Sequence, residues 1–182
     1  EKKLMCGITG YIGSGSAIEI TINNLKRLEY RGYDSAGVAY SSTDAVSIVR
    51  APGKIKNLEA LLPTSVEGIG VAIAHTRWAT HGRPCEENAH PHRDCTGQLA
   101  VVHNGIIENY AELRRELIAK GHEFASETDT ETLAHLIEEM CALEGDCDKT
   151  EGVANAIRKA LHHVKGSYAL AVISQDSPDT VF

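Results

Sequence analysis

Segments with helical periodicity and segments with strand character are both plentiful in this chain, yet they do not alternate as regular βαβ units. Apolar residues three or four positions apart, as at Ile18, Ile22 and Leu25, predict helices, whereas short apolar or alternating runs predict strands. Because each helix and each sheet must bury one apolar face against another element, this mixture predicts a layered domain of the α/β or α+β class.

Capping signals and breakers set the boundaries of the expected elements, for example the capping box Thr128–Glu131 and the helix stop at Gly121. The expected strands cover Gly7–Gly13, Ser35–Ser41, Val46–Ala51, Gly68–His75, Gln98–Asn104 and Tyr168–Ser174. The expected helices cover Ala17–Tyr30, Ile55–Leu62, Tyr110–Lys120, Thr150–His163 and the segment after the capping box that carries Leu133, Leu136, Ile137 and Met140.

The composition limits the class of protein. With 182 residues, 42% of them hydrophobic and 24% charged, the chain is long enough for one globular domain that buries about 70% of its unfolded surface. Its net charge of −7, without a basic cluster, argues against a nucleic-acid partner. The longest clear apolar run, Tyr168 to Ile173, is far shorter than the ~20 residues of a membrane helix, so no membrane partner is expected.

The N-terminal segment and the cysteines bear on the compartment. Glu1–Met5 is basic, but the apolar stretch after it is short and broken by glycine, so no signal peptide is predicted and a cytoplasmic protein is expected. The cysteines are odd in number and form no dense pattern, which favours reduced thiols over a disulfide framework. They are Cys6, Cys85, Cys95, Cys141 and Cys147.

Cys6 opens the segment Cys6–Gly13, directly after Met5. If Cys6 becomes the first residue, its thiol is a nucleophile and its own α-amine can act as the base that activates it. A lone cysteine is more often a small buried core residue. The catalytic interpretation therefore depends on the rest of the sequence.

Four further segments accompany the first one: Arg31–Gly37, His75–Gly82, His103–Asn109 and Ser126–Glu131. In this order, they resemble the glutaminase (class-II glutamine amidotransferase) domains of the glucosamine-6-phosphate synthases, the isomerizing glutamine–fructose-6-phosphate aminotransferases. The resemblance runs from Cys6 to the C-terminus. Around Arg77 and Asp129 the sequence is more similar to these synthases than to amidophosphoribosyltransferases or asparagine synthetases.

The resemblance implies an α+β fold, the four-layer αββα sandwich of N-terminal-nucleophile hydrolases, with two antiparallel sheets between helices. It implies an amidotransferase domain over residues 6–182 that continues beyond Phe182, and an N-terminal extension over residues 1–5. The implied enzyme hydrolyses L-glutamine to L-glutamate and ammonia. In such synthases sugar-phosphate isomerase domains, absent from this sequence, pass the ammonia to fructose 6-phosphate. No cofactor is implied, and the oligomeric state, a homo-oligomer included, stays open.

The resemblance also implies three catalytic residues. Cys6 attacks the side-chain amide of glutamine and forms a thioester, releasing ammonia. The Asn104 side chain and the Gly105 backbone N–H form an oxyanion hole, in which each donor is worth ~3–4 kcal/mol of barrier. From the residues alone, Asn-Gly is equally a signal for a hairpin turn.

The residues implied to bind glutamine carry the charges that its two ends require. Arg77 holds the α-carboxylate with its bidentate fork, and Asp129 receives the α-ammonium. Thr80 and His81 line the same pocket on a loop that closes over it. From the sequence alone, Asp129 is first explained as an acid in the first turn of a helix, where the helix dipole favours it.

Three supporting residues complete the implied site. Arg31 and Gly32 orient the amine of Cys6, and Trp78 gates the passage of ammonia towards the synthase domain. The structural alternatives are a helix C-terminal charge followed by a glycine C-cap for Arg31 and Gly32, and a core aromatic for Trp78.

An alternative function belongs to a different class. Cys85, His90, His92 and Cys95, with His81 nearby, form a Cys/His-rich loop that could bind zinc. The loop has neither a C-x-x-C nor an H-x-x-x-H pair, so no metal site is predicted. A further alternative is the glutaminase domain of another class-II amidotransferase.

Overall fold

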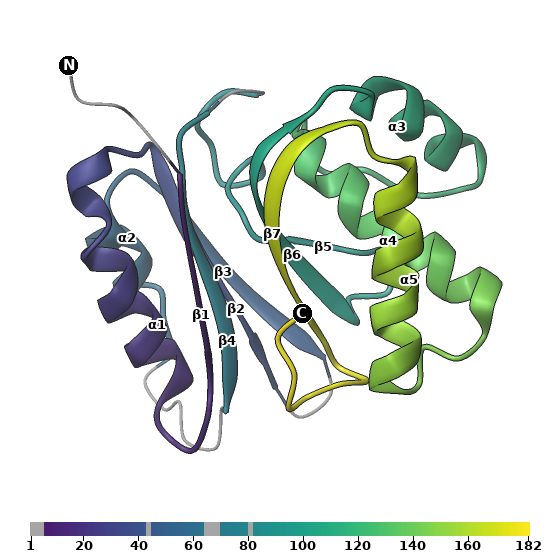
Figure 1. The fold of residues 1–182 in the computed structure, drawn as a ribbon. Coiled ribbons are helices and arrows are strands. Elements are labelled where there is room, and N and C mark those ends of the chain that lie inside the picture. Colours follow the sequence, from purple (N-terminus) through teal and green to yellow (C-terminus); the bar gives the residue numbers. More distant parts are fainter. Residues whose placement is uncertain (1–5, 43–44, 64–69, 80–81) are drawn as a thin grey trace.

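The computed structural model describes residues 6–42, 45–63, 70–79 and 82–182. Two antiparallel sheets lie face to face, and helices cover the outer face of each sheet (Figure 1). This arrangement confirms the α+β class and the four-layer αββα sandwich that the sequence predicted.

The first sheet has the strand order β1-β4-β2-β3 and the second has the order β5-β6-β7, each antiparallel throughout. The strands are β1 Gly7–Ile12, β2 Ser35–Ser41, β3 Val46–Pro52, β4 Val71–Arg77, β5 His92–Arg93, β6 Leu99–Ile107 and β7 Gly166–Ser174. The helices are α1 Ala17–Lys26, α2 Ile55–Glu59, α3 Tyr110–Ala119, α4 Asp129–Glu144 and α5 Thr150–His163. Helices α1 and α2 cover the first sheet, and α3, α4 and α5 lie on the side of the second (Figure 1).

The apolar core divides into three clusters that match the three interfaces between the four layers. Ala39, Ile73, Val102 and Ile173 belong to the cluster between the sheets. A second cluster fills the space between the first sheet and its two helices, and a third fills the space between the second sheet and α3 to α5. The central strands β2 and β4 of the first sheet therefore have both faces covered, which explains why they are almost entirely buried.

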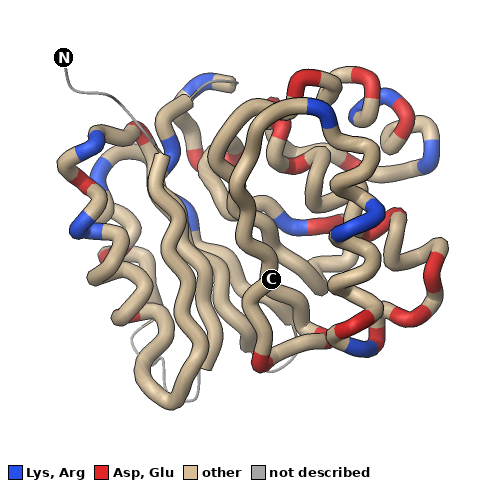
Figure 2. The backbone as a smooth tube through the Cα atoms, viewed as in Figure 1, with Lys and Arg blue, Asp and Glu red and all other residues tan. Residues whose placement is uncertain are grey.

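Charged residues lie mainly on the helices and the connecting segments, and the strands are drawn almost entirely in tan in Figure 2. Lys and Arg are interspersed with Asp and Glu over this surface, as expected for a chain without a basic cluster. Within the described part of the chain, no helix has the length and apolar character that crossing a bilayer requires.

Three local features differ from the expectations. The first helix ends at Lys26 instead of Tyr30, and a 3-10 turn over Glu29–Arg31 follows it. The short strand β5 was not predicted, because two residues give no periodicity. The capping box is only half formed: the Thr128 hydroxyl accepts from the Glu131 N–H at 3.4 Å, but the Glu131 carboxylate accepts from the preceding residues Ala125 and Ser126.

The expectation that all thiols are reduced is wrong for two of the five cysteines. Cys141, near the end of α4, forms a disulfide with Cys147, which lies before α5. Gly145 ends α4 in the left-handed conformation, with φ of 72°, and the turn brings the two Cα atoms to 5.4 Å. Among the described residues, Cys6, Cys85 and Cys95 are free.

Gly37 on β2 gives a test of the close approach between this strand and the segment before β5. A Cβ at Gly37 would lie 2.2 Å from the His90 carbonyl oxygen, so the backbone must move. We expect Gly37→Ala to lower the free energy of unfolding by about 2–3 kcal/mol. Gly10→Ala, on an outer strand of the same sheet with its nearest contact at 3.7 Å, is the control and stays within about 0.5 kcal/mol. Equal denaturation midpoints for the two variants would contradict the close approach.

Candidate functional site

A cavity of about 290 Å³ opens at the end of the sandwich where β1 begins and β4 ends. Its volume lies at the lower end of the range of small-molecule sites, which is roughly 300–1,000 Å³. The described residues that line it come from β4, β6, α4 and the segments beside them: Cys6, Arg77, Trp78, His90, His103, Asn104, Gly105, Ile106 and Asp129.

Cys6 lies directly before β1 and is half-buried at this cavity. Its sulfur accepts a hydrogen bond from the backbone N–H of Trp78 at 3.2 Å. The largest influence on the pKa of the Cys6 thiol is burial, which raises it. The hydrogen bond from Trp78 lowers this pKa and the charge of Asp34 raises it, and the net pKa is raised. The resting sulfur is therefore a thiol, and a reaction that uses the thiolate needs a base nearby.

Asn104 faces Cys6 from β6, and its side-chain amide donates to the Cys6 carbonyl oxygen at 3.4 Å. The other end of the same amide, Oδ1, lies 2.7 Å from Nε2 of His75 on β4. Burial is the largest influence on His75 and lowers its pKa to about 3, so the ring is neutral. Because Oδ1 only accepts, the His75 proton sits on Nε2, and this hydrogen bond turns the Asn104 NH₂ towards Cys6.

Gly105 continues β6 beyond Asn104 and pairs with Tyr168 of β7. Its φ is 128°, and a Cβ here would lie 2.1 Å from the Ser167 carbonyl oxygen. The alternative that Asn104 and Gly105 form a hairpin turn is therefore wrong, because both residues lie inside a strand. The glycine is needed for the close approach of β7 and for a backbone that L side chains rarely adopt.

Arg77 and Asp129 bring one cation and one anion to the same cavity. Each is 3% exposed. Nη2 of Arg77, the last residue of β4, donates to the Gly82 carbonyl at 3.3 Å. Oδ2 of Asp129, the first residue of α4, accepts from the Ile107 N–H at 3.0 Å. Asp129 thus occupies the first helical turn, as the structural alternative required, and also lines the cavity.

Asp34 is a residue that the sequence interpretation missed. Its backbone N–H donates to the Arg77 carbonyl at 2.8 Å, and its carboxylate accepts from the Ala79 N–H. These two bonds fix the turn that presents Trp78 to Cys6. An acid directly before a predicted strand gave no signal of this role, because the turn belongs to a segment some 45 residues further along the chain.

Arg31 and Gly32 do not line the cavity. Arg31 donates from Nε to the Tyr30 hydroxyl at 3.3 Å, and Gly32 caps the 3-10 turn with φ of 79°, as the structural alternative described. An effect of either residue on the Cys6 amine stays a prediction. Thr80 and His81 lie outside the described residues. Trp78 is 41% exposed and lines the cavity, so it is not a core aromatic.

The alternative zinc loop is not assembled. The ring of His90 stacks on His75 with centroids 4.4 Å apart, and Nε2 of His92 lies 2.9 Å from the Thr128 hydroxyl. Both histidines are buried between the layers. Among the described residues, the potential ligands grouped with Cys95 are His122, His135 and Glu138. Cys85, His90 and His92 do not belong to this group.

Comparison with protein families gives one assignment. The model of a family described as "Glutamine amidotransferase domain" matches residues 75–182.

Sequence relatives extend the match over nearly the whole chain. It is 52% identical over 179 residues to the glutamine–fructose-6-phosphate aminotransferase [isomerizing] of Thermococcus kodakarensis, and 49% identical over 179 residues to that of Helicobacter pylori. Each match covers 98% of this chain. The chain spans only 29% of the length of either relative.

Solved structures give the same fold. A glutamine phosphoribosylpyrophosphate amidotransferase from B. subtilis, complexed with ADP and GMP, matches with a TM-score of 0.74 at 29% identity. A structure described as the allosteric regulatory enzyme of purine biosynthesis matches with a TM-score of 0.74 at 30% identity. Each match covers 92% of this chain and 35% of the solved chain.

Because three buried histidines lie in and near the cavity, we expect the protein to lose stability in mild acid. Burial is the largest influence lowering the pKa of His75 and His92 to about 3, and that of His90 well below its usual value. The unfolded chain protonates the same residues near pH ~6.5. Because the unfolded state then binds more protons, the free energy of unfolding falls between pH ~7 and ~5.5, by about 1 kcal/mol for each histidine.

Chemical denaturation at the two pH values measures this effect. His135 has the opposite effect on the free energy of unfolding, because its pKa in the folded state is raised to about 9. Its contribution is the same in all the proteins compared. We expect His90→Gln to show a smaller pH dependence than the unmodified chain. His162→Gln, at an exposed position near the end of α5, is the control and keeps the full dependence. The same pH dependence in all three proteins would contradict the account.

Proposed function

The chain belongs to the glutamine amidotransferase domain family, and on this premise we propose that it hydrolyses L-glutamine to L-glutamate and ammonia in the cavity beside Cys6. One observation supports this proposal above all. A nucleophile, two oxyanion donors and a pair of opposite charges, carried by separate segments of the chain, line one cavity of metabolite size. They are Cys6, Asn104, Gly105, Arg77 and Asp129.

The charges favour a free amino acid as the substrate. Glutamine is a zwitterion, and Arg77 and Asp129 offer a guanidinium and a carboxylate from two different walls of the cavity. In our proposal Arg77 binds the α-carboxylate through its bidentate fork and Asp129 binds the α-ammonium. Thr80 and His81, which follow Arg77 closely in the sequence, are proposed to complete this end of the pocket.

The reaction begins with transfer of the Cys6 thiol proton to the α-amine of the same residue. This base is available only when Cys6 is the first residue, because the nitrogen of a Met5–Cys6 peptide bond has no basic lone pair. The thiolate attacks the amide carbon, the C–N bond breaks, and the α-ammonium returns its proton to the leaving nitrogen, which departs as ammonia. Water then cleaves the thioester and gives glutamate.

Asn104 and Gly105 stabilise the negative oxygen that forms in each of these two steps. The Asn104 NH₂ already points towards Cys6, because His75 holds its Oδ1. The Gly105 N–H follows in the same strand, where the close approach of β7 fixes the backbone. Donors that are fixed before the reaction need no reorganisation when the charge develops.

The relatives support a proposal for the wider role of the domain. We propose that residues 6–182 form the ammonia-supplying domain of a glutamine–fructose-6-phosphate aminotransferase, with residues 1–5 as an extension. Fructose 6-phosphate is then the acceptor, bound by sugar-phosphate isomerase domains of the parent enzyme. Trp78, which lies against Cys6 and is partly exposed, is the proposed gate for ammonia. A cytoplasmic location stays a prediction.

Labelling with a glutamine analogue that carries an electrophilic side chain tests the proposed reaction, in a chain that begins at Cys6, as the proposed base requires; the Arg77 and Arg93 variants are made in the same chain. The analogue should alkylate Cys6 and spare Cys85 and Cys95, because only Cys6 lies beside the proposed glutamine clamp. Peptide mapping by mass spectrometry locates the label, and Cys85→Ala is the control, with unchanged labelling and glutaminase activity. A label mainly on Cys85 or Cys95 would rule out Cys6 as the nucleophile.

Substitution of Arg77 tests the recognition of the amino acid. Arg77→Lys keeps the charge but cannot make the bidentate pair, so kcat/KM for glutamine should fall about 10- to 100-fold, chiefly through KM. Arg93→Lys, on the exposed side of β5, is the matched control and should leave kcat/KM unchanged. Unaltered kcat/KM in a folded Arg77→Lys protein would remove Arg77 from the proposed site.

A further inference from the structure

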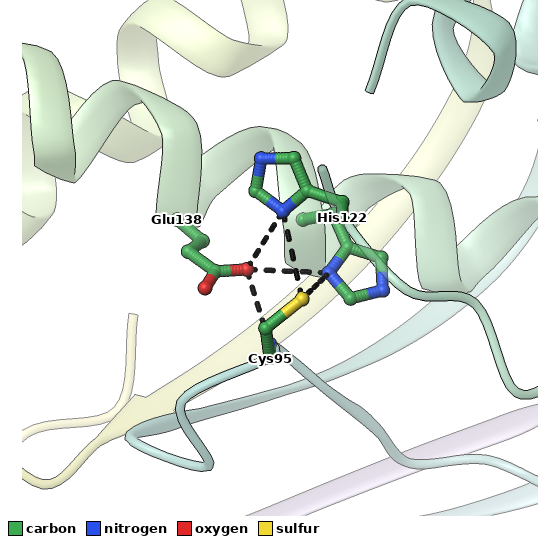
Figure 3. Close-up of side chains that lie close together, drawn as sticks. Cys95, His122 and Glu138 are labelled. Atoms are coloured by element: carbon green, nitrogen blue, oxygen red, sulfur yellow. Dashed lines mark hydrogen bonds and ion pairs between the residues drawn. The ribbon is translucent and has the colours of Figure 1, made fainter. Parts of the chain in front are cut away.

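Four side chains with metal-ligating atoms meet beside α4, and none of them lines the cavity beside Cys6. They are Cys95 in the turn between β5 and β6, His122 after α3, and His135 and Glu138, three residues apart on α4. Their ligand atoms all lie within 4.8 Å of one another. Figure 3 shows Cys95, His122 and Glu138 pointing towards a common centre from these separate elements.

Four of the six distances between the ligand atoms are close to the edges of a tetrahedral zinc site. The Cys95 sulfur lies 3.7 Å from Nδ1 of His122 and 3.4 Å from Nδ1 of His135. Oε2 of Glu138 lies 3.1 Å and 3.2 Å from the same two nitrogens. Tetrahedral zinc, with bonds of about 2.3 Å to sulfur and about 2.0–2.1 Å to nitrogen and oxygen, requires edges of about 3.3–3.6 Å. The two remaining distances, Cys95 to Glu138 and His122 to His135, are at most 4.8 Å, so modest side-chain shifts bring the four atoms around one ion.

Each histidine of the cluster also has a carboxylate behind it. Nε2 of His122 lies 3.3 Å from the Glu139 carboxylate, and Nε2 of His135 lies 3.8 Å from the Glu131 carboxylate. A metal-bound histidine characteristically donates its second ring N–H to such a carboxylate, which orients the ring and raises its basicity. In both rings Nδ1 faces the cluster and Nε2 faces an acid; the contact of His122 is within hydrogen-bond distance, whereas that of His135 is an ion-pair contact.

The cluster is accessible and has acidic side chains around it. Cys95 is exposed and, together with His135, lines a cavity of about 1140 Å³ that gives a route for an ion. The carboxylates of Glu131 and Glu139 lie next to the two histidines, so further negative charge surrounds the four ligand atoms.

We propose that Cys95, His122, His135 and Glu138 form a binding site for one divalent transition-metal ion, with Zn²⁺ as the ion that fits best. One sulfur, two imidazole nitrogens and one carboxylate oxygen match its ligand preferences. Four protein ligands fill a tetrahedral shell and leave no position for a substrate, so the site is structural. The ion joins the β5–β6 turn and the segment after α3 to α4, whose first residue is Asp129.

The sequence spacing did not predict this ligand set. The loop hypothesis included Cys95 but joined it to Cys85, His90 and His92, its neighbours in the sequence. The structure instead places Cys95 beside residues 27, 40 and 43 positions away. Only the i, i+3 pair His135 and Glu138 is local, and such a pair on a helix is common without a metal.

Metal titration of chelator-treated protein tests the proposal, in a Cys6→Ala background that removes a competing thiol. Isothermal calorimetry with Zn²⁺ should show one ion per chain, and Co²⁺ should give a thiolate-to-metal charge-transfer band. Cys95→Ser should abolish this band and weaken binding at least about 100-fold, and Glu139→Gln should weaken it about 10- to 100-fold. Cys85→Ser is the matched control and should bind as the parent does.

Thermal unfolding gives a second readout. Zn²⁺ should raise the Tm of the parent and of Cys85→Ser, because binding to the folded state alone stabilises it, and should leave the Tm of Cys95→Ser unchanged. If the parent binds neither Zn²⁺ nor Co²⁺ at one per chain, the four side chains form only a hydrogen-bonded cluster. Equal binding by the parent and Cys95→Ser, or a Co²⁺ complex without the thiolate band, would also overturn the proposal.

Discussion

The hydrogen bond between Nε2 of His75 and Oδ1 of Asn104 joins the two sheets at the cavity. Nε2–H of the ring donates to Oδ1, so the Asn104 NH₂ has no orientation other than towards Cys6. The sandwich therefore sets the geometry of the oxyanion donor before any substrate is bound. Burial keeps the His75 ring neutral in the folded protein, and this connects the site to the pH dependence of the fold.

Helix α4 connects the cavity beside Cys6 with the cluster at Cys95. Its first residue, Asp129, lines the cavity and accepts from the Ile107 N–H, so the helix start is fixed to the end of β6. Two turns later the same helix presents His135 and Glu138 to Cys95. A metal ion at that cluster would restrain the helix that carries the proposed glutamine ligand. The position of Asp129 then depends on contacts at both of these places along α4.

The sequence was sufficient for the class of fold and for most residues around the cavity, since Cys6, Arg77, Asn104 and Asp129 each stand in a segment with a recognisable pattern. Their convergence depends on the register between strands, which no local pattern contains. For the same reason the role of His75 was missed: its partner Asn104 lies in the facing sheet. The cluster at Cys95 was missed because its ligands come from three elements.

A double-mutant cycle on kcat for glutamine hydrolysis, in a chain that begins at Cys6, tests the central claim, that His75 acts by holding Asn104. Asn104→Ala should lower kcat about 100- to 1,000-fold. His75→Leu should lower kcat strongly in the parent but very little in the Asn104→Ala background, because the amide that it orients is already gone. His75→Gln, which can still donate to Oδ1, should recover part of the loss. An equal loss from His75→Leu in both backgrounds, with both proteins folded, would contradict the account.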